Sequence, residues 1–108
     1  MTVKELCEKN GYKVICMPDP EREVMGGYAG DLLSWVMGRA DAGDAWVTIM
    51  SNVNIIAVAS LADPACIILS EGVEPDDGVR ERAEMQGVNL LSSRDDTFAV
   101  CAQIASLL

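Results

Sequence analysis

Hydrophobic and polar positions change period repeatedly along this chain, and the change is clearest between positions 45 and 70. A hydrophobic strand is predicted over 45–50, a nearly wholly apolar helix over 54–62, and a second, β-branched strand over 65–70. A polar turn, Ser51-Asn52, separates the first strand from the helix. A strand, tight turn, helix and strand of these lengths are typical of a βαβ crossover, which makes the two strands parallel.

The other elements are predicted from their boundary residues. Thr2 is suited to cap a helix over 3–10 that Gly11 ends, and a strand over 12–17 stops at a proline-rich turn. Residues 21–25 are interpreted as either an edge strand or an extended loop. The glycines of 26–30 permit a close approach to the next helix, and Asp31 suits the first turn of that helix. Further helices are expected over 32–38, 75–86 and 97–107, with a strand over 88–91.

This alternation of strands and helices with short connections predicts the fold class. We expect an α/β protein, a single three-layer α/β/α domain over 1–108, with a mostly parallel sheet of about four to five strands. The order of the strands in the sheet cannot be deduced from the pattern.

Two of the predicted helices are apolar on more than one face. A surface helix of a small domain normally carries a polar stripe, so a helix without one is either central or covered by another subunit. Two-fold pairs are the commonest assembly of identical chains. We therefore expect a homodimer whose interface includes Leu33, Trp35, Met37, Ile55 and Val58. The alternative is a well-packed monomer.

The composition and net charge of the chain argue against two classes of binding partner, nucleic acids and anionic membranes. The chain has 108 residues, half of them hydrophobic, and a formal net charge of −9. Such an acidic chain is not attracted to nucleic acid or to an anionic membrane. No apolar run approaches the roughly 20 residues of a membrane span, and the charged N-terminus is unlike a signal peptide. A cytoplasmic location is expected.

The sequence offers no recognisable catalytic set. It contains no histidine, which excludes Ser-His-Asp and Cys-His arrangements. Gly38 to Gly43 has the glycine spacing of a phosphate loop, but Asp44 stands where lysine is required. The sequence lacks the paired C-x-x-C spacing that is typical of a zinc site. We therefore expect the four cysteines to be buried and reduced: Cys7, Cys16, Cys66 and Cys101. We expect no metal, no cofactor and no enzymatic activity.

Polar turns follow several of the predicted strands. In a parallel sheet such turns converge on one edge, where α/β proteins usually bind ligands, and free N–H groups at helix starts can hold an anion. Glu71, Asp95 and Asp96 would compete for these donors. The candidate ligand-binding residues are Ser51, Asn52, Ser70, Gly72, Arg94 and Thr97.

The same turns carry a family likeness. The matching segments are Gly27-Tyr28-Ala29-Gly30-Asp31-Leu32-Leu33-Ser34, the strand and turn 46–52, Ile67-Ile68-Leu69-Ser70-Glu71-Gly72, and Asp96-Thr97-Phe98. The chain from about Asp31 to its end resembles the DRTGG domain. The resemblance is strongest over 26–108. It is also similar to the N-terminal, non-catalytic domain of HPr kinase/phosphorylase. The resemblance implies a small α/β regulatory or oligomerisation module, in some relatives close to bound nucleotide.

Two departures from the family pattern concern the ligand. The family's Asp-Arg pair appears here as Asn52-Val53, and its Thr-Gly-Gly stretch appears as Ser70-Glu71-Gly72. Losing the arginine removes a fixed cation, and Glu71 adds a repelling charge.

Three hypotheses follow. The first is a non-catalytic regulatory or scaffold module that acts through homodimerisation and contact with an unidentified protein partner. The second is a sensor that binds a nucleotide-like small ligand at the strand-end turns. An enzyme is the third, and no nucleophile–base pair or metal set supports it.

Overall fold

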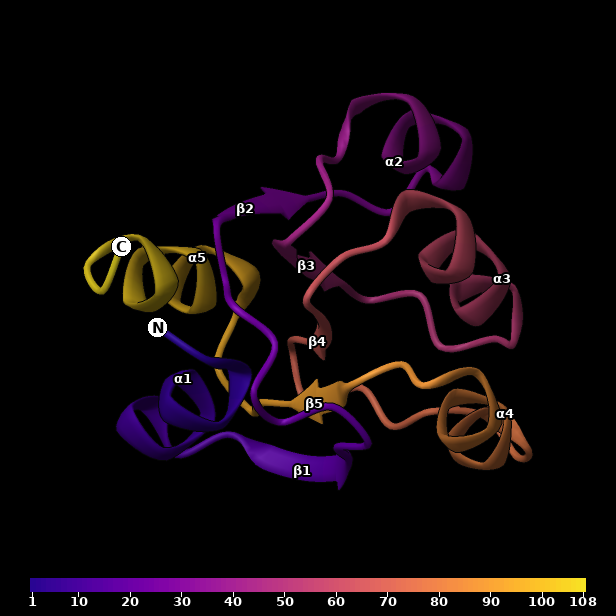
Figure 1. Ribbon diagram of the computed structural model, residues 1–108, viewed down its shortest axis with the longest axis horizontal. Coiled ribbons are helices and arrows are strands. Elements are labelled where there is room, and N and C mark those ends of the chain that lie inside the picture. The colour runs from indigo at the N-terminus through magenta and orange to yellow at the C-terminus, as the bar shows by residue number, and fades with distance from the viewer.

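Five strands form one sheet in the computed structural model, which describes residues 1–108 (Figure 1). The helices are α1 (Val3–Asn10), α2 (Leu33–Arg39), α3 (Asn54–Ala62), α4 (Val79–Gln86) and α5 (Thr97–Ala105). The strands are β1 (Lys13–Cys16), β2 (Gly26–Ala29), β3 (Asp44–Thr48), β4 (Cys66–Leu69) and β5 (Leu90–Ser92).

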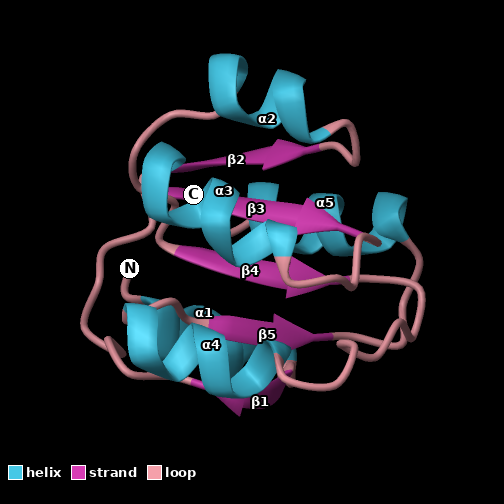
Figure 2. Cartoon of the chain, turned by 90° about the vertical axis from the view of Figure 1, so that its right-hand side faces the viewer, coloured by secondary structure: helices cyan, strands magenta, loops and turns pink.

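The strand order is β1-β5-β4-β3-β2, and the four strands from β2 to β5 are parallel. Only β1 is antiparallel, and it pairs with β5 through an irregular register. Helices α2, α3 and α4 cover one face of the sheet, and α1 and α5 cover the other (Figures 1 and 2). The predicted fold class, a mostly parallel sheet between two layers of helices, is confirmed.

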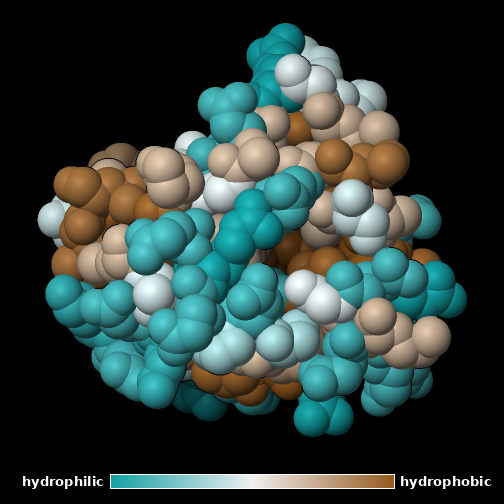
Figure 3. Space-filling model, in the orientation of Figure 1, coloured by the Kyte–Doolittle hydropathy of each residue, from teal (hydrophilic) through white to brown (hydrophobic).

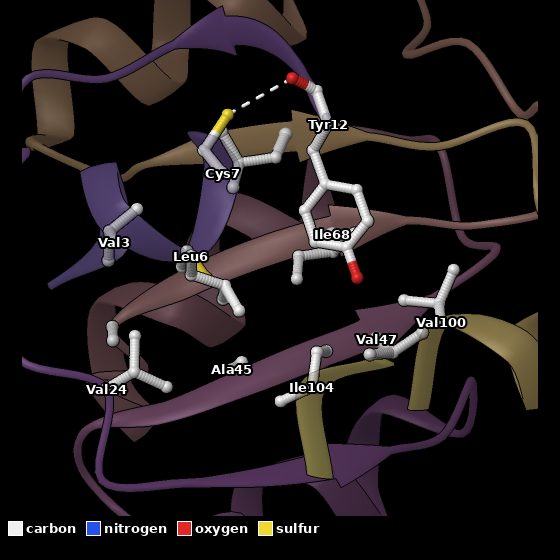
Figure 4. Close-up of a cluster of buried hydrophobic side chains, with 13 residues drawn as sticks. Val3, Leu6, Cys7, Tyr12, Val24, Ala45, Val47, Ile68, Val100 and Ile104 are labelled. Atoms are coloured by element: carbon white, nitrogen blue, oxygen red, sulfur yellow. Dashed lines mark hydrogen bonds between the residues drawn. The ribbon is translucent and has the colours of Figure 1, made fainter. Parts of the chain in front are cut away.

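Alternating side chains of the central strands enter two separate cores. Ala45 and Val47 of β3 pack toward α1 and α5, whereas Trp46 packs toward α2, α3 and α4. The core on the α1 side also contains Tyr12 and two thiols, and the Cys7 thiol donates a hydrogen bond to the Tyr12 carbonyl at 3.1 Å (Figure 4). All five residues of β3 and all four of β4 are buried, as expected for central parallel strands.

Local capping explains the helix boundaries that the sequence predicts well. The Thr2 side chain accepts a hydrogen bond from the Glu5 N–H, and the Glu5 side chain accepts one from the Thr2 N–H, which together form a capping box. Gly11 ends α1 in the left-handed conformation. The predicted ranges of α1 and α3 match the structure at both ends.

Three expectations about segments were wrong. Residues 26–29 form strand β2, and a Cβ atom at Gly26 would lie 2.8 Å from Asp44 Oδ1, so glycine permits this pairing. Asp31 lies outside α2, and its carboxylate accepts hydrogen bonds from Thr48 Oγ1 at 2.8 Å and the Ile49 N–H at 2.9 Å. Helix α4 begins at Val79, four residues after Pro75. Segment 21–25 is an extended loop with one isolated bridge, Thr2 to Glu23.

The two edges of the sheet differ. At the β1 edge the Arg80 side chain donates a hydrogen bond from Nε to the Ile15 carbonyl at 2.9 Å, and the pairing with β5 is irregular. The β2 edge consists of Gly26-Gly27-Tyr28-Ala29 and contains neither a charged residue nor proline. Charges, irregular pairing and covering groups are the usual protection of an exposed strand, so β2 is the open edge.

Candidate functional site

The structure separates the six predicted ligand-binding residues into three places. Ser51 and Asn52 follow β3, Ser70 and Thr97 meet between β4 and α5, and Gly72 and Arg94 line a polar hollow. All three places lie at the carboxyl ends of the parallel strands, as expected. Gly72 and Arg94 border an open cavity.

The turn after β3 is engaged in structural hydrogen bonds. Ser51 Oγ donates to Asp76 Oδ1 at 2.9 Å, and the Asp76 N–H donates to the Ser51 carbonyl at 2.9 Å. Asn52 Oδ1 accepts from the Asn54 N–H at 2.9 Å and thereby supports the start of α3. These hydrogen bonds hold the β3–α3 turn against the loop before α4. The polar atoms of the turn therefore have little hydrogen-bonding capacity left for a ligand.

The start of α5 is occupied by a carboxylate of the chain itself. Glu71 Oε2 accepts a hydrogen bond from the Thr97 N–H at 2.8 Å, and the hydroxyl oxygens of Ser70 and Thr97 are 2.7 Å apart. Asp96 Oδ1 accepts from the Ala99 N–H at 2.7 Å as the N-cap. Acidic groups are favourable at the positive end of a helix. Two carboxylates therefore already satisfy the amides that an external anion would use.

A polar hollow of about 730 Å³ lies between the end of α1, the start of β1 and the loops that follow β4 and β5. Ten residues line it, and Val73 is the one hydrophobic residue among them. The lining residues are Asn10, Gly11, Lys13, Gly72, Val73, Glu74, Ser92, Ser93, Arg94 and Asp95. The loop after β4 reaches this wall because Glu71 and Gly72 are both left-handed, with φ of 62° and 72°. Their N–H groups donate to the carbonyls of Asp95 and Ser93, respectively.

Two cations and two acids border this hollow. Lys13 Nζ lies 3.7 Å from Glu74 Oε2, and both side chains are about two-thirds exposed. Asp95 Oδ2 instead accepts a hydrogen bond from Gln103 Nε2 at 2.7 Å. Arg94 takes part in no ion pair. Sequence reasoning missed Lys13, because its position beside the hollow depends on the pairing of β1 with the distant strand β5.

The predicted dimer residues fall into a buried and an exposed group. Ile55 and Val58 belong to the core of the monomer, where they pack with Trp46. Trp35 and Met37 of α2 are about half exposed, and Leu33 is partly buried. Arg39 lies over the Trp35 ring at 3.6 Å from its centroid. Of the predicted interface, the α2 residues remain accessible to a partner.

A second, apolar hollow of about 320 Å³ lies between α5 and the open edge strand. Its floor contains Gly27 and Ala29 of β2, and its wall includes Ile104 and Leu108. Hydrophobic atoms gather over the C-terminal end of α5 in Figure 3. The hollow exists because β2 presents only small residues toward α5.

Burial keeps the thiols protonated. It raises the pKa of Cys66 to about 12, and it raises the pKa values of Cys7, Cys16 and Cys101. All four cysteines are unpaired, and no group of three or more acidic or cysteine side chains is arranged to hold a metal ion. None of the helices is both long enough and apolar enough to cross a membrane.

Comparison with known protein families shows which family this chain belongs to. The profile of the DRTGG domain matches residues 30–107. The chain belongs to the DRTGG domain family. The match confirms the resemblance carried by the turns after β4 and β5, whereas the likeness to the N-terminal domain of HPr kinase/phosphorylase stays a prediction. No curated protein matches this DRTGG domain.

A solved structure has the same fold. It is the crystal structure of the CBS and DRTGG domains of the regulatory region of Clostridium perfringens pyrophosphatase, complexed with its activator, diadenosine tetraphosphate. The TM-score is 0.76 at 12% sequence identity, and the match covers 99% of this chain and 47% of the other. This DRTGG chain therefore spans about half the length of that protein's regulatory fragment.

Proposed function

We propose that this DRTGG domain is a non-catalytic regulatory or scaffold module that acts through homodimerisation and contact with another protein. The observation that carries the proposal is the apolar surface of α2 at the open edge of the sheet. Trp35 and Met37 of α2 are 51% and 48% exposed, and Leu32, the N-cap residue before the helix, is 57% exposed. Trp35 and Met37 are two positions apart and therefore lie on different sides of the helix. A helix that exposes apolar side chains on more than one side is typical of one covered by another subunit.

The position of this surface supports the proposal further. Helix α2 lies at the β2 end of the sheet, and α4 lies at the opposite end (Figure 2). The apolar hollow beside α5 borders the same strand, β2, on the other face of the sheet. The open strand edge is therefore flanked by hydrophobic groups on both faces, a combination that favours burial against a second chain.

Sedimentation velocity at micromolar concentration tests the proposal with a matched pair of variants. Met37→Glu places a charge on the α2 surface, and Met85→Glu places the same charge on α4, where Met85 is 79% exposed. We expect a dimer for the wild type and for Met85→Glu, and a monomer for Met37→Glu. A monomeric wild type, or equal dissociation of the two variants, would contradict the proposal.

A second candidate function is a sensor of a nucleotide-like small ligand, and the polar hollow favours it. The hollow lies at the carboxyl ends of the strands and within the size range of small-molecule sites. A related regulatory fragment binds a dinucleotide activator. Thermal shift with adenine nucleotides tests this function, because a ligand at 100-fold excess over its Kd should add about 2.7 kcal/mol of stability. No shift with any nucleotide would leave only the scaffold function.

A further inference from the structure

We infer that the polar hollow binds the phosphate groups of its ligand between Lys13 and Arg94, with the Ser92 hydroxyl as a further contact. This inference rests on the proposed sensor function and deepens it, because it assigns the chemical class that the hollow recognises. The ligand class is a compound with two or more linked phosphates, such as a nucleoside triphosphate or an inorganic polyphosphate.

The strand pairing brings the key groups together. Lys13 and Ser92 are direct partners in the antiparallel pairing of β1 with β5, so their side chains share one face of the sheet. Arg94 follows two residues after Ser92 in the loop that leads to α5. Two cations from segments about 80 residues apart in sequence therefore border the same cavity. A lysine and an arginine that border one hollow suit a group with several anionic oxygens.

Ser92 provides an independent observation. Only 6% of the residue is exposed, and it lines the hollow. The neighbouring side chains are hydrogen-bonded: Ser93 Oγ accepts from the Asp95 N–H, and Asn10 Nδ2 donates to the Tyr12 hydroxyl. None of the hydrogen bonds within the protein engages the Ser92 hydroxyl. Every fully buried polar side-chain atom of the chain has a hydrogen-bond partner, so the Ser92 hydroxyl oxygen is not fully buried and is free to donate a hydrogen bond to a ligand in the hollow.

The acids at the rim do not neutralise both cations. Asp95 is directed to Gln103, and Asp96 and Glu71 accept hydrogen bonds from the first amides of α5. Only Glu74 approaches Lys13, at 3.7 Å between well-exposed side chains, and such pairs contribute little. A phosphate can displace Glu74 and leave Arg94 as a second, unopposed charge.

The lining also decides which part of a nucleotide the hollow recognises. Val73 is its only hydrophobic residue, and it contains no aromatic side chain on which a base could stack. Binding energy therefore comes from the phosphates, and a compound without a base should bind as well as ATP. Charge-based recognition of this kind weakens as salt is added.

Isothermal titration calorimetry of the full chain with sodium tripolyphosphate, ATP and adenosine tests the inference. We expect both phosphate compounds to bind and adenosine not to bind. Arg94→Gln and Lys13→Gln should each weaken binding at least tenfold, whereas Arg82→Gln and Lys4→Gln, with the same loss of charge on exposed surface elsewhere, should change it less than twofold. Glu74→Gln should strengthen binding several-fold, because it frees Lys13.

The outcomes separate this inference from the functions on which it rests. Binding of ATP without binding of tripolyphosphate would overturn the phosphate hollow and leave a nucleotide sensor. Equal losses for Arg94→Gln and Arg82→Gln would also overturn it, since they would indicate attraction by overall charge alone. Absence of binding by all three compounds would overturn both the inference and the sensor function, and sedimentation would still decide the scaffold function.

Discussion

Removing the Asn89 side chain should destabilise the domain by about 3 kcal/mol, because this amide joins three backbone groups. Asn89 is 2% exposed and immediately precedes β5. Its Nδ2 donates to the Asp19 carbonyl at 2.7 Å and to the Ala65 carbonyl at 3.0 Å, and its Oδ1 accepts from the Asp19 N–H at 2.9 Å. The side chain thus fastens the loop after β1 to the start of β4.

The magnitude follows from which of these groups can reach water. Ala65 is 2% exposed, and an unsatisfied buried carbonyl costs about 1–3 kcal/mol. The two bonds to the exposed residue Asp19 are partly replaceable by water and contribute about 0.5–1 kcal/mol each. Asn89→Ala should therefore lower the urea midpoint by about 2–3 M, given a typical slope of about 1–1.5 kcal/mol per M for a small domain.

Urea unfolding followed by tryptophan fluorescence measures this change, because Trp46 is fully buried. Asn54→Ala is the matched control, since Asn54 is exposed and its side chain makes no hydrogen bond, and it should change stability by less than about 0.5 kcal/mol. In Asn89→Asp the side chain keeps its acceptor oxygen but places a negative charge against the two carbonyls that Nδ2 contacts. At pH 7 this variant should therefore be less stable than Asn89→Ala, and part of its stability should return in acid, where the carboxylate is protonated. A loss below about 1 kcal/mol for Asn89→Ala would show that the buried Ala65 carbonyl does not depend on this amide.

Two further predictions concern the Cys66 thiol and the Glu71 carboxylate. The pKa of the Cys66 thiol is about 12 in the folded chain and 9.0 for an unperturbed thiol, which represents the unfolded chain. Because only the unfolded chain loses this proton between pH 9 and 12, the unfolding free energy is unaffected below pH 9 and falls by about 1.4 kcal/mol per pH unit above it. Cys66→Ala should show a shallower loss of stability than the wild type between pH 9 and 11 in urea titrations, and identical slopes would argue against this assignment. Glu71→Gln removes a charge from the start of α5 and should lower the unfolding free energy by about 0.5–1 kcal/mol in low salt. The difference should shrink in 1 M NaCl, and a salt-independent difference would indicate another cause.

The sequence predicts those elements whose boundaries depend on neighbouring residues. Thr2 and Gly11 define α1 by local hydrogen bonds, and Asp96 does the same for the start of α5. The strand β2 escaped prediction because two glycines and an alanine have little strand propensity, and only its pairing with β3 makes this segment extended. Propensity there yields to tertiary context.

The start of α4 shows a different limit. Pro75 and its acidic neighbours are typical of a first helical turn, but the chain takes the left-handed conformation at Gly78, with φ of 85°. A left-handed residue interrupts an α-helix, so α4 begins only after it, at Val79. Glycine permits this conformation without requiring it, so the residue pattern alone does not place the start of the helix.

The candidate site was predictable in location and only partly in composition. The turns after β3, β4 and β5 do lie at one end of the sheet, as parallel strands require. Most of their polar atoms, however, are engaged with one another, as the contacts of Ser51 and Ser70 illustrate. Lys13 joins the site only because β1 runs antiparallel beside β5, which the order of elements along the chain does not reveal.

The unequal edges of the sheet also limit how many copies of the chain can assemble by backbone pairing. Arg80 already donates a hydrogen bond to the Ile15 carbonyl, so a further strand that used this carbonyl would have to displace that contact. Growth of a continuous sheet through many molecules needs two receptive ends on each of them, and this chain has one. Assembly through β2 would therefore terminate at a pair, which protects the protein from fibrous aggregation even though its remaining edge is bare.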